Sequence, residues 1–443
     1  MRGIKIRDNV PKRVGSQRVC TAEDTYAKVR PLFQDVGITR LSDITWLDRI
    51  GIPVYNAIVP RSREDVSVYT GKGMTAVHSK VSAIMEAIER NVGLLPLQPA
   101  ETASYESLAS AGRKVVRPSE LNLELLPHYR DDVAIHWVAG HDIVSDEPVL
   151  VPHCAVSLAP APGAPRCYRL VTANGLASGN CIEEAICHAL AEVVERDAQT
   201  FAELISSRLP HVLEMGAMGA RPPAERLSAL QARHPQVDMA TISPEAQRMV
   251  EMFERAGVTI QLCSMTTDVG VPVMLAVTRE DNGSGMSQAH AGMGACPNAE
   301  VAMLRAITEC AQSRAVDIQS MREDFIPADA SGPGFQVYGK RLSTVNTDVW
   351  PWVSGGKSIS MTEVASHVSD DVVSDLWFMV DRLRSVGLSR VVVVDLSPPD
   401  LPVKVARVLV PGLESWGSDR SKLGPRATGA WNAAMQAATR GAA

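Results

Sequence analysis

The chain has 443 residues, of which 45% are hydrophobic and 21% charged, and its formal net charge is −6. This length can form one large domain or two to three smaller ones, and the composition is that of an ordinary globular protein. The negative balance excludes a global positive field for binding nucleic acid. No apolar run approaches the roughly 18 residues of a membrane span, and the N-terminus shows no apolar secretory signal, so we expect a cytoplasmic protein.

The eight cysteines are scattered along the chain, and none forms a C-x-x-C pair. No histidine or cysteine has the spacing of a zinc finger. We therefore expect reduced thiols, as in a cytosolic protein, and no structural zinc.

Basic residues are concentrated in the first 18 positions, where Asp8 is the single acid. A run of this kind usually forms a solvated arm, and the alternative is a contact with phosphate or an acidic peptide. The basic residues are Arg2, Lys5, Arg7, Lys12, Arg13 and Arg18.

The rest of the chain alternates between strand and helix patterns. β-Branched runs with Pro, Gly or Asp at their edges predict strands at 136–144, 149–158, 258–265, 271–280, 391–397 and 405–412. Apolar periodicity predicts helices at 76–94, 182–203, 246–256, 298–318 and 371–386. Stretches rich in Pro and Gly predict loops at 159–167 and 331–335. Strands adjoin one another as often as they alternate with helices, which favours an α/β fold with mixed sheets.

Two of the predicted helices share the frame A-x-x-E-x-x-E-R. When each is wound at about 100° per residue, its apolar residues fall on one side and its acidic residues on a narrow stripe beside them. The stripes consist of Ser82, Glu86 and Glu89 on the first helix, and of Glu184, His188, Glu192 and Glu195 on the second.

A solvated amphipathic face is the ordinary interpretation of such stripes. Like charges three and four residues apart repel, however, and Arg90 and Arg196 relieve this only in part. A cation between the two helices accounts for the repetition better. Mg²⁺ prefers carboxylate oxygens and usually binds together with substrate phosphates, so the residues predict a Mg²⁺–nucleotide site. Its expected metal ligands are Glu86, Glu89, Glu184, Glu192 and Glu195.

A Gly-rich stretch precedes each acidic helix, at 70–74 and at 174–181. Glycine allows close approach of the backbone, and helix N-termini favour anions. Lys72 adds a point charge suited to phosphate. Neither stretch has the spacing of a Walker A loop.

A third stretch, 305–314, repeats the first Glu of the frame but not the second. Arg305 and Glu309 lie four residues apart, so they could simply pair with each other on a helix surface. A Gly-rich loop is expected just before this stretch. It contains Cys296, which we expect to be a buried, inert thiol rather than a sulfur carrier.

In these motifs the chain resembles the YcaO family, over about residues 12 to 415. The family pattern G-K-G, then eight residues, then S-x-x-x-E-x-x-E-R is met by Gly71, Lys72, Gly73, Ser82, Glu86, Glu89 and Arg90. A second pattern, N-x-x-x-E followed by E-x-x-E-R, is met by Asn180, Glu184, Glu192, Glu195 and Arg196. Arg18 and Thr25 are similar to a basic residue and a hydroxyl residue that the family carries near its N-terminus.

The resemblance implies a YcaO-type nucleotide-binding fold in which the acidic helices converge on Mg²⁺ ions that hold one ATP. It implies an enzyme that transfers the γ-phosphate of ATP to a backbone amide oxygen of a peptide. Lys72, Arg196 and Arg305 are the expected catalytic residues. The expected nucleotide contacts are Arg18, Thr25, Lys72, Ser82, Glu86, Glu89, Arg90, Asn180, Glu184, Glu192, Glu195, Arg196, Arg305 and Arg314.

Family members differ in the product, which is an azoline, a thioamide or a macrocyclic amidine. Azoline-forming members commonly end in P-x-P-x-P, whereas this chain ends in WNAAMQAATRGAA. Segments 37–54 and 405–415 look like those of members that work with a TfuA partner, which are linked to thioamide formation. We therefore expect thioamidation of a ribosomally made peptide, with azoline or amidine formation as alternatives. A TfuA-like or leader-binding partner is expected, and a homodimer is left open.

The expected domain organisation has three parts. Residues 1–60 form a basic arm and a first α/β segment, 61–415 form the ATP-binding catalytic domain, and 416–443 form a tail without P-x-P-x-P.

Two rival classes fit the residues less well. A carboxylate di-metal oxidase needs Glu-x-x-His, which neither acidic helix contains. A nucleotide-binding scaffold, or an enzyme of other ATP-driven chemistry, remains an alternative because resemblance of a fold does not fix function. We expect His188 to hydrogen-bond a carboxylate rather than to contact nucleotide.

Overall fold

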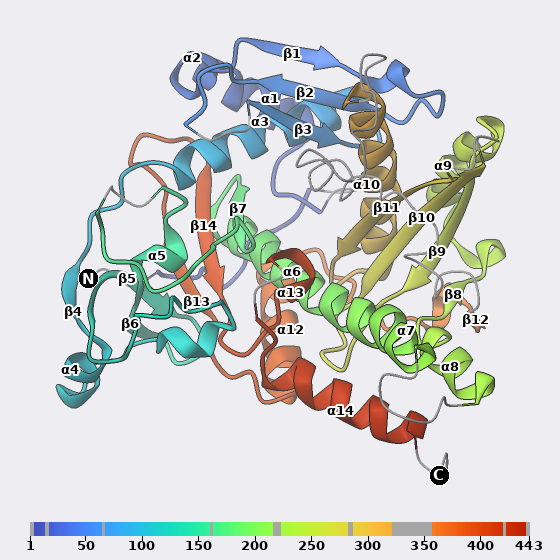
Figure 1. Ribbon diagram of the computed structural model, residues 1–443. Helices are drawn as coiled ribbons and strands as arrows, with labels where there is room; N and C mark the ends of the chain where they lie inside the picture. Colours follow the sequence, from blue (N-terminus) through green and yellow to red (C-terminus); the bar gives the residue numbers. More distant parts are fainter. Residues whose placement is uncertain are drawn as a thin grey trace, which may run out of the picture.

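The computed structural model describes residues 4–13, 17–63, 67–159, 163–215, 223–281, 287–320, 357–419 and 422–439. Three β-sheets with helices packed on them make up these parts (Figure 1). Most neighbouring strands are antiparallel, whereas β8 and β12 are parallel. The predicted α/β class with mixed sheets is therefore confirmed.

The first sheet has the order β1-β2-β3 and carries helix α3, on which α1 packs. Its elements are β1 (Arg40–Asp43), β2 (Val54–Ile58), β3 (Val68–Lys72), α1 (Ala22–Val29), α2 (Phe33–Val36) and α3 (Ala76–Gly93). Thr75 caps α3, since its hydroxyl accepts from the His78 amide.

The second sheet has the order β11-β10-β9-β8-β12 and carries α9 and α10. Its elements are β8 (Gln236–Val237), β9 (Thr259–Ser264), β10 (Val273–Asp281), β11 (Ser287–Ala295), β12 (Ser358–Ile359), α9 (Pro244–Arg255) and α10 (Ala299–Ser320).

The third sheet has the order β4-β5-β13-β14-β7, and β6 pairs with β5. Its strands are β4 (Glu101–Ser104), β5 (Ala134–Asp142), β6 (Glu147–Pro152), β7 (Leu176–Gly179), β13 (Val392–Asp395) and β14 (Lys404–Leu409). Helix α6 (Ile182–Phe201) packs on β7 and β14 and also contacts α12 (Val372–Ser385) and β11. It therefore runs through the middle of the molecule, with the largest apolar cluster around it (Figure 1).

In each sheet an edge strand leads directly into a long helix that packs back on it. These three strand–helix units are β3–α3, β7–α6 and β11–α10. A Cβ added to Gly71, Gly179 or Gly292 would lie 2.1, 2.5 and 2.1 Å, respectively, from a backbone nitrogen of the helix of its own unit. The glycines are thus required because each helix lies directly on its strand.

The remaining helices lie at the ends of these units. They are α4 (Tyr105–Ser110), α5 (His153–Val156), α7 (Leu209–Glu214), α8 (Ala224–Gln231), α13 (Trp416–Asp419) and α14 (Pro425–Thr439). A π-helical segment, Ala202–Arg208, joins α6 to α7 without a break. Leu204 and Ile205 of this segment pack with Ala434 of α14 in a separate apolar cluster.

Two local predictions are wrong. The strand expected over 149–158 ends at Pro152, after which α5 begins, because proline cannot donate to a further ladder bond. The Gly-rich loop expected before the third motif is the strand β11, whose nine residues pair with β10. Of the two expected loops, 331–335 lies outside the described residues.

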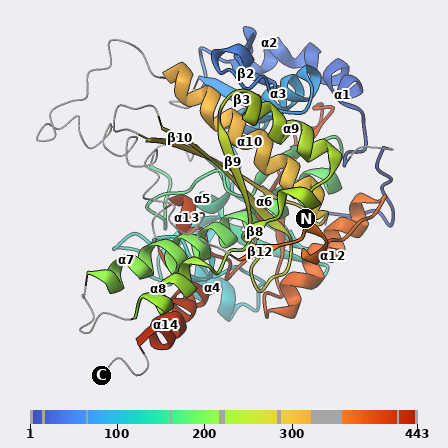
Figure 2. The same cartoon turned by 90° about the vertical axis from the view of Figure 1, so that its right-hand side faces the viewer.

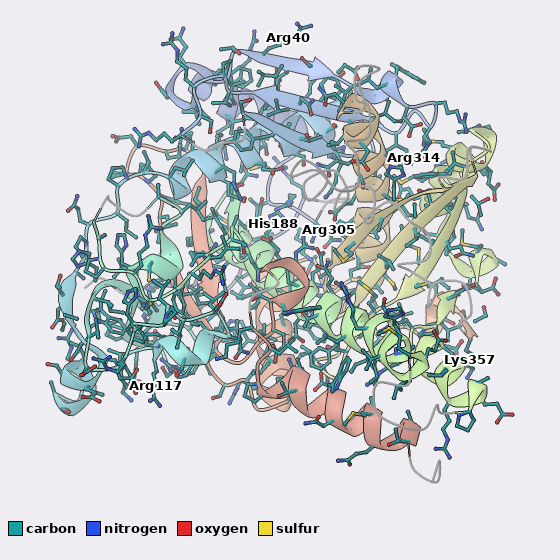
Figure 3. All side chains as sticks on the ribbon, in the orientation of Figure 1. Arg40, Arg117, His188, Arg305, Arg314 and Lys357 are labelled. Atoms are coloured by element: carbon teal, nitrogen blue, oxygen red, sulfur yellow. The ribbon has the colours of Figure 1, made fainter. Side chains whose placement is uncertain are left out.

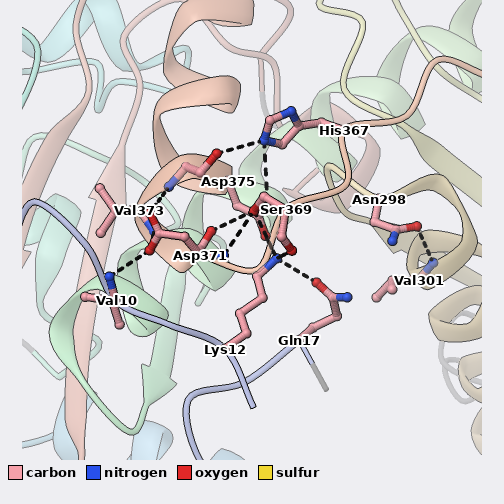
Figure 4. A network of polar contacts seen from close by, with 11 residues as sticks. Val10, Lys12, Gln17, Asn298, Val301, His367, Ser369, Asp371, Val373 and Asp375 are labelled. Atoms are coloured by element: carbon pink, nitrogen blue, oxygen red, sulfur yellow. Dashed lines mark hydrogen bonds and ion pairs between the residues drawn. The ribbon is translucent and has the colours of Figure 1, made fainter. Parts of the chain in front are cut away.

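The basic N-terminal arm packs against the protein at Lys12, whereas Lys5, Arg7 and Arg13 are exposed, so the expectation of a solvated arm holds only in part. Arg7 binds Glu183 with its backbone and side chain, and Lys12 lies 2.5 Å from Asp375 of α12. Figure 4 shows Lys12 among the polar side chains at the start of α12. Acidic side chains of α6 and α12 thus hold the arm in place.

Turned by 90°, the molecule shows α10 close to β3, with which it is in contact (Figure 2). Within the parts of the chain that the structure describes, no helix is both long and apolar enough to cross a bilayer.

Candidate active site on three acidic helices

Glu89 of α3 is tied to the neighbouring unit. Its carboxylate accepts a hydrogen bond of 2.9 Å from the Ser178 amide in β7. Burial, followed by the nearby charges of Glu192 and Glu86, raises its pKa well above the usual range. Glu86 is exposed one turn earlier, and Ser82 is half-buried one turn before that. The predicted stripe of α3 therefore faces α6.

Glu184, in the first turn of α6, gathers the predicted N-terminal contacts. Its carboxylate accepts from Arg18 at 3.3 Å, from the Val19 amide at 3.1 Å and from the Asn180 amide at 3.3 Å. Arg18, Asn180 and Glu184, which the sequence assigned to one site, thus lie together. The carboxylate also faces the N-terminal end of the helix dipole, where a negative charge is favoured.

Thr25 and Asn180, both predicted to contact the nucleotide, are in contact with each other. The Asn180 side-chain amide donates to Thr25 Oγ1 at 3.1 Å. Lys28, one turn along α1, donates to Asn180 Oδ1 at 3.0 Å. The sequence interpretation omitted Lys28, although its spacing of three from Thr25 on a helix could have indicated it.

Glu192 and Glu195 lie on the next two turns of α6. Burial raises the pKa of both, and that of Glu195 reaches about 7. Arg196 lies 3.3 Å from Glu195 and partly offsets the effect. Its charge alone does not neutralise this group of carboxylates, and such strongly perturbed acids in one place are typical of functional sites.

Glu309 of α10 joins the same group from the third unit. It forms an ion pair with Lys72 at the end of β3, and its other oxygen accepts from the Met293 amide at 3.3 Å. Burial alone would raise the pKa of Glu309, but the charges of Lys72 and Arg196 outweigh burial and lower this pKa. The sequence interpretation noted this residue but left it out of the predicted metal ligands.

The predicted arginines of α10 have different surroundings. Arg305 donates a hydrogen bond of 2.8 Å to the Ala295 carbonyl, instead of forming the simple surface pair with Glu309. Arg314 forms a buried ion pair with Asp48, 2.8 Å apart. Figure 3 shows Arg305 near the centre of the molecule and Arg314 farther along α10.

A pocket lies between the N-terminal arm, α6 and α10. Arg18, Glu184, His188 and Arg305 line it, and Figure 3 shows His188 and Arg305 near each other. Cys296, which is buried as expected, lines it too. Nδ1 of His188 is buried without a hydrogen-bond partner among the described residues, so this side chain has a free polar atom for a ligand.

The carboxylates fit a magnesium ion held together with nucleotide better than a preformed metal cage. Among the described residues no three His, Cys, Asp or Glu side chains converge as in such a cage. Glu184, Glu195 and Glu309 instead pair with arginine or lysine. Mg²⁺ sites for nucleotides commonly use a few carboxylates plus phosphate oxygens, which matches this donor set.

The sequence interpretation also missed Asp197 and Glu414, whose carboxylates bind the start of α14. Asp197, next to Arg196, is fully buried and lies 2.6 Å from Arg426 of α14. The carboxylate of Glu414 accepts from the Gly424 and Ala427 amides around the start of the same helix. These bonds join the described part of the expected tail to α6, close to the acidic group.

The sequence has relatives over most of its length. A protein of Methanothermobacter thermautotrophicus is 34% identical over 397 residues, covering 88% of this chain and 93% of the relative. A protein encoded in the tfuA 3′ region of Rhizobium leguminosarum bv. trifolii is 33% identical over 409 residues, covering 90% of this chain and 88% of the relative. Both are uncharacterised proteins.

Solved structures share the fold. A YcaO protein of Methanopyrus kandleri bound with AMPPCP and Mg²⁺ has a TM-score of 0.68 and 24% identity, covering 94% of this chain and 98% of that one. A heterocyclase in complex with substrate and cofactor has a TM-score of 0.73 and 22% identity and covers 93% of this chain. The present chain spans only 54% of that heterocyclase.

The family model described as YcaO cyclodehydratase, ATP- and Mg²⁺-binding, matches residues 70–414. This range contains all three acidic helices and the five carboxylates expected to bind the metal. The chain is therefore an enzyme that belongs to the YcaO family of ATP- and Mg²⁺-binding proteins.

Proposed function

We propose that the protein uses ATP to activate a backbone amide of a ribosomally made peptide and replaces its oxygen by sulfur. A sulfide adds to the amide carbon, the amide oxygen takes the γ-phosphoryl group after or together with this addition, and the oxygen then leaves as phosphate. The balance is amide, hydrogen sulfide and ATP to thioamide, ADP and phosphate.

The residues of α3, α6 and α10 suit the phosphoryl transfer. Phosphoryl transfer depends on positioning and on neutralising charge at the transferred group, to which bound Mg²⁺ contributes. Lys72 and Arg196 lie beside Glu309 and Glu195 and would face the phosphates. Arg18 and Asn180, which both contact the Glu184 carboxylate, would hold the rest of the nucleotide.

The observation that favours a thioamide is the relative in the tfuA 3′ region, with 33% identity over 90% of this chain. A physical argument agrees with it. An azoline forms from a nucleophile tethered next to the amide, whose effective concentration is high, so no delivery is needed. A thioamide needs sulfur from outside, and a TfuA-like partner is the proposed means of bringing it.

Azoline formation is the second candidate, because the matching family model is described as a cyclodehydratase. The mass of the product separates the two. Exchange of oxygen for sulfur adds about 16 Da, whereas cyclodehydration removes about 18 Da. Peptide modification should survive replacement of every Cys, Ser and Thr in the core peptide by Ala. Loss of modification, together with loss of water from the native peptide, would establish a cyclodehydratase instead.

Partner dependence has a separate test. Phosphate release is measured with peptide, in the presence and absence of the TfuA-like protein. We expect little release without the partner, and equal rates would contradict the proposal.

A further inference from the structure

A second pocket is lined by Arg407, on which the charges of Glu192 and Glu89 act, so it lies near the acidic group. It reaches α6 at Val193, the residue next to Glu192. Most of its lining is apolar, including Leu121, Leu123, Val171, Leu409 and Leu413. A ligand that fills it must therefore carry an apolar part.

Arg407 of β14 also lines this pocket and is buried with an exposed fraction of only 3%. Its Nη2 donates to the Thr172 carbonyl at 2.8 Å. Nε and Nη1 have no hydrogen-bond partner among the described residues. A buried guanidinium with two unused donors is costly, and an acceptor oxygen supplied by a ligand would remove that cost.

Asn174 provides the complementary atom. Its Oδ1 is buried and has no hydrogen-bond partner among the residues that the structure describes, and Asn174 lines the same pocket. A peptide group has one carbonyl oxygen for Arg407 and one N–H for Asn174. A phosphate ion in this pocket would face the carboxylate of Glu414, which also lines it and would repel the ion.

Strand β7 and the residue before it place this pocket beside the acidic group. The Gly175 amide binds Glu192, and the Ser178 amide binds Glu89. Between them, Leu176 is the partner of Arg407 in the pairing of β7 with β14. The charges of Glu192 and Glu89 also act on Arg407, so a peptide group bound to Arg407 would lie near these carboxylates.

We infer that this pocket binds a backbone peptide group and its apolar side chain, next to the amide that is activated, and that Arg407 and Asn174 recognise it. The inference rests on the proposed function for the presence of a peptide substrate. It adds a subsite and a preference for an apolar neighbouring residue.

The test uses the full chain with Mg²⁺–AMPPCP and the probe N-acetyl-glycyl-leucine N-methylamide, whose affinity is measured by saturation-transfer NMR. Val171→Trp fills the pocket, and Arg407→Met removes the donors but keeps the length of the side chain. Val133→Trp is the matched control, because Val133 is also a half-buried loop valine but does not line the pocket.

Both pocket variants should bind the probe at least about tenfold more weakly, as expected for losing hydrogen bonds to a charged group or the space itself. The control should bind as the unmodified chain does. Circular dichroism and AMPPCP affinity identify a variant that has merely unfolded, in which case Asn174→Ala replaces it. Unchanged probe binding in Val171→Trp, or no probe binding to the unmodified chain, would overturn the inference.

Inorganic phosphate is the competing ligand and is titrated against the probe. Displacement of the probe by millimolar phosphate would assign Arg407 to phosphate and contradict the peptide assignment. The outcome is independent of the product of the reaction. A peptide that loses about 18 Da refutes thioamidation but leaves this subsite intact, whereas normal probe binding in Val171→Trp refutes the subsite alone.

Discussion

Lys72 and Glu309 form an ion pair across 237 residues of sequence, between the end of β3 and the middle of α10. The pair joins two of the three strand–helix units at the point where the phosphates of a nucleotide are proposed to lie. A nucleotide phosphate would compete with Glu309 for Lys72 and leave the carboxylate free to bind Mg²⁺. The pair is thus a connection that nucleotide binding would open.

Lys72→Met should weaken the binding of Mg²⁺–AMPPCP by at least about tenfold, because a charge-assisted hydrogen bond to phosphate is lost. Calorimetric titration measures the dissociation constant. Lys80→Met is the control, since Lys80 lies on α3 over the ring of Tyr55 and outside the acidic group. Equal affinities of the two variants would show that Lys72 does not contact the nucleotide.

Glu89→Gln and Glu195→Gln should each abolish ATP turnover. Both substitutions remove a negative charge expected to hold Mg²⁺ while preserving the shape of the side chain. Far-UV circular dichroism should be unchanged, because raised pKa values mean that the neutral form already suits the fold. Full turnover in both variants, measured as phosphate release with peptide and partner, would rule out the metal assignment.

Metal affinity should rise with pH. Glu195 titrates near 7 rather than near 4.5 in the metal-free protein, so protons compete with Mg²⁺ below neutrality. Because the pKa of Glu195 is higher in the folded chain than in the unfolded one, this residue stabilises the fold fully below about pH 4.5. That stability is lost as the pH rises through about 7. The melting temperature in EDTA should therefore fall between pH 5 and 8, about the window of this titration, while added Mg²⁺–AMPPCP should stabilise most at the upper end. Glu195→Gln should flatten the EDTA curve, and an equal slope in that variant would assign the effect elsewhere.

Gly71→Ala and Gly292→Ala should each destabilise the fold by about 1–3 kcal/mol, because the new methyl group meets the helix backbone. Gly429→Ala is the matched control. It lies within α14 with open space around its Cβ position, and it should stabilise by about 0.5–1 kcal/mol. Urea unfolding measures all three, and a neutral Gly71→Ala would mean that the helix moves away without cost.

Periodicity in the sequence located α3, α6, α9, α10 and α12 to within a few residues, because each has a clear apolar side. It missed β11, whose sequence SQAHAGMGA lacks β-branched residues. This strand exists because its glycines let α10 lie on it and because β10 pairs along its whole length. Those causes are tertiary and leave no pattern of period two.

The candidate site likewise contains residues that the sequence predicts and residues that it does not. Glu86, Glu89, Glu184, Glu192 and Glu195 follow from spacing on single helices. Glu309 and Arg407 do not, since their importance depends on neighbours such as Lys72 and Leu176, far away in sequence. The contacts of the N-terminal arm were missed for this reason, because the acids that bind Arg7 and Lys12 lie beyond position 180.

The π-helical segment Ala202–Arg208 determines in which direction the side chains of α7 point relative to the acidic stripe of α6. Each residue of an α-helix turns the chain by about 100°, so removing one residue here would rotate α7 by that amount. The leucines that now meet α14 would then face elsewhere, while the carboxylates would stay in place. Length variation in this segment would therefore change the packing of the C-terminal helix without changing the spacing of the carboxylates on α6.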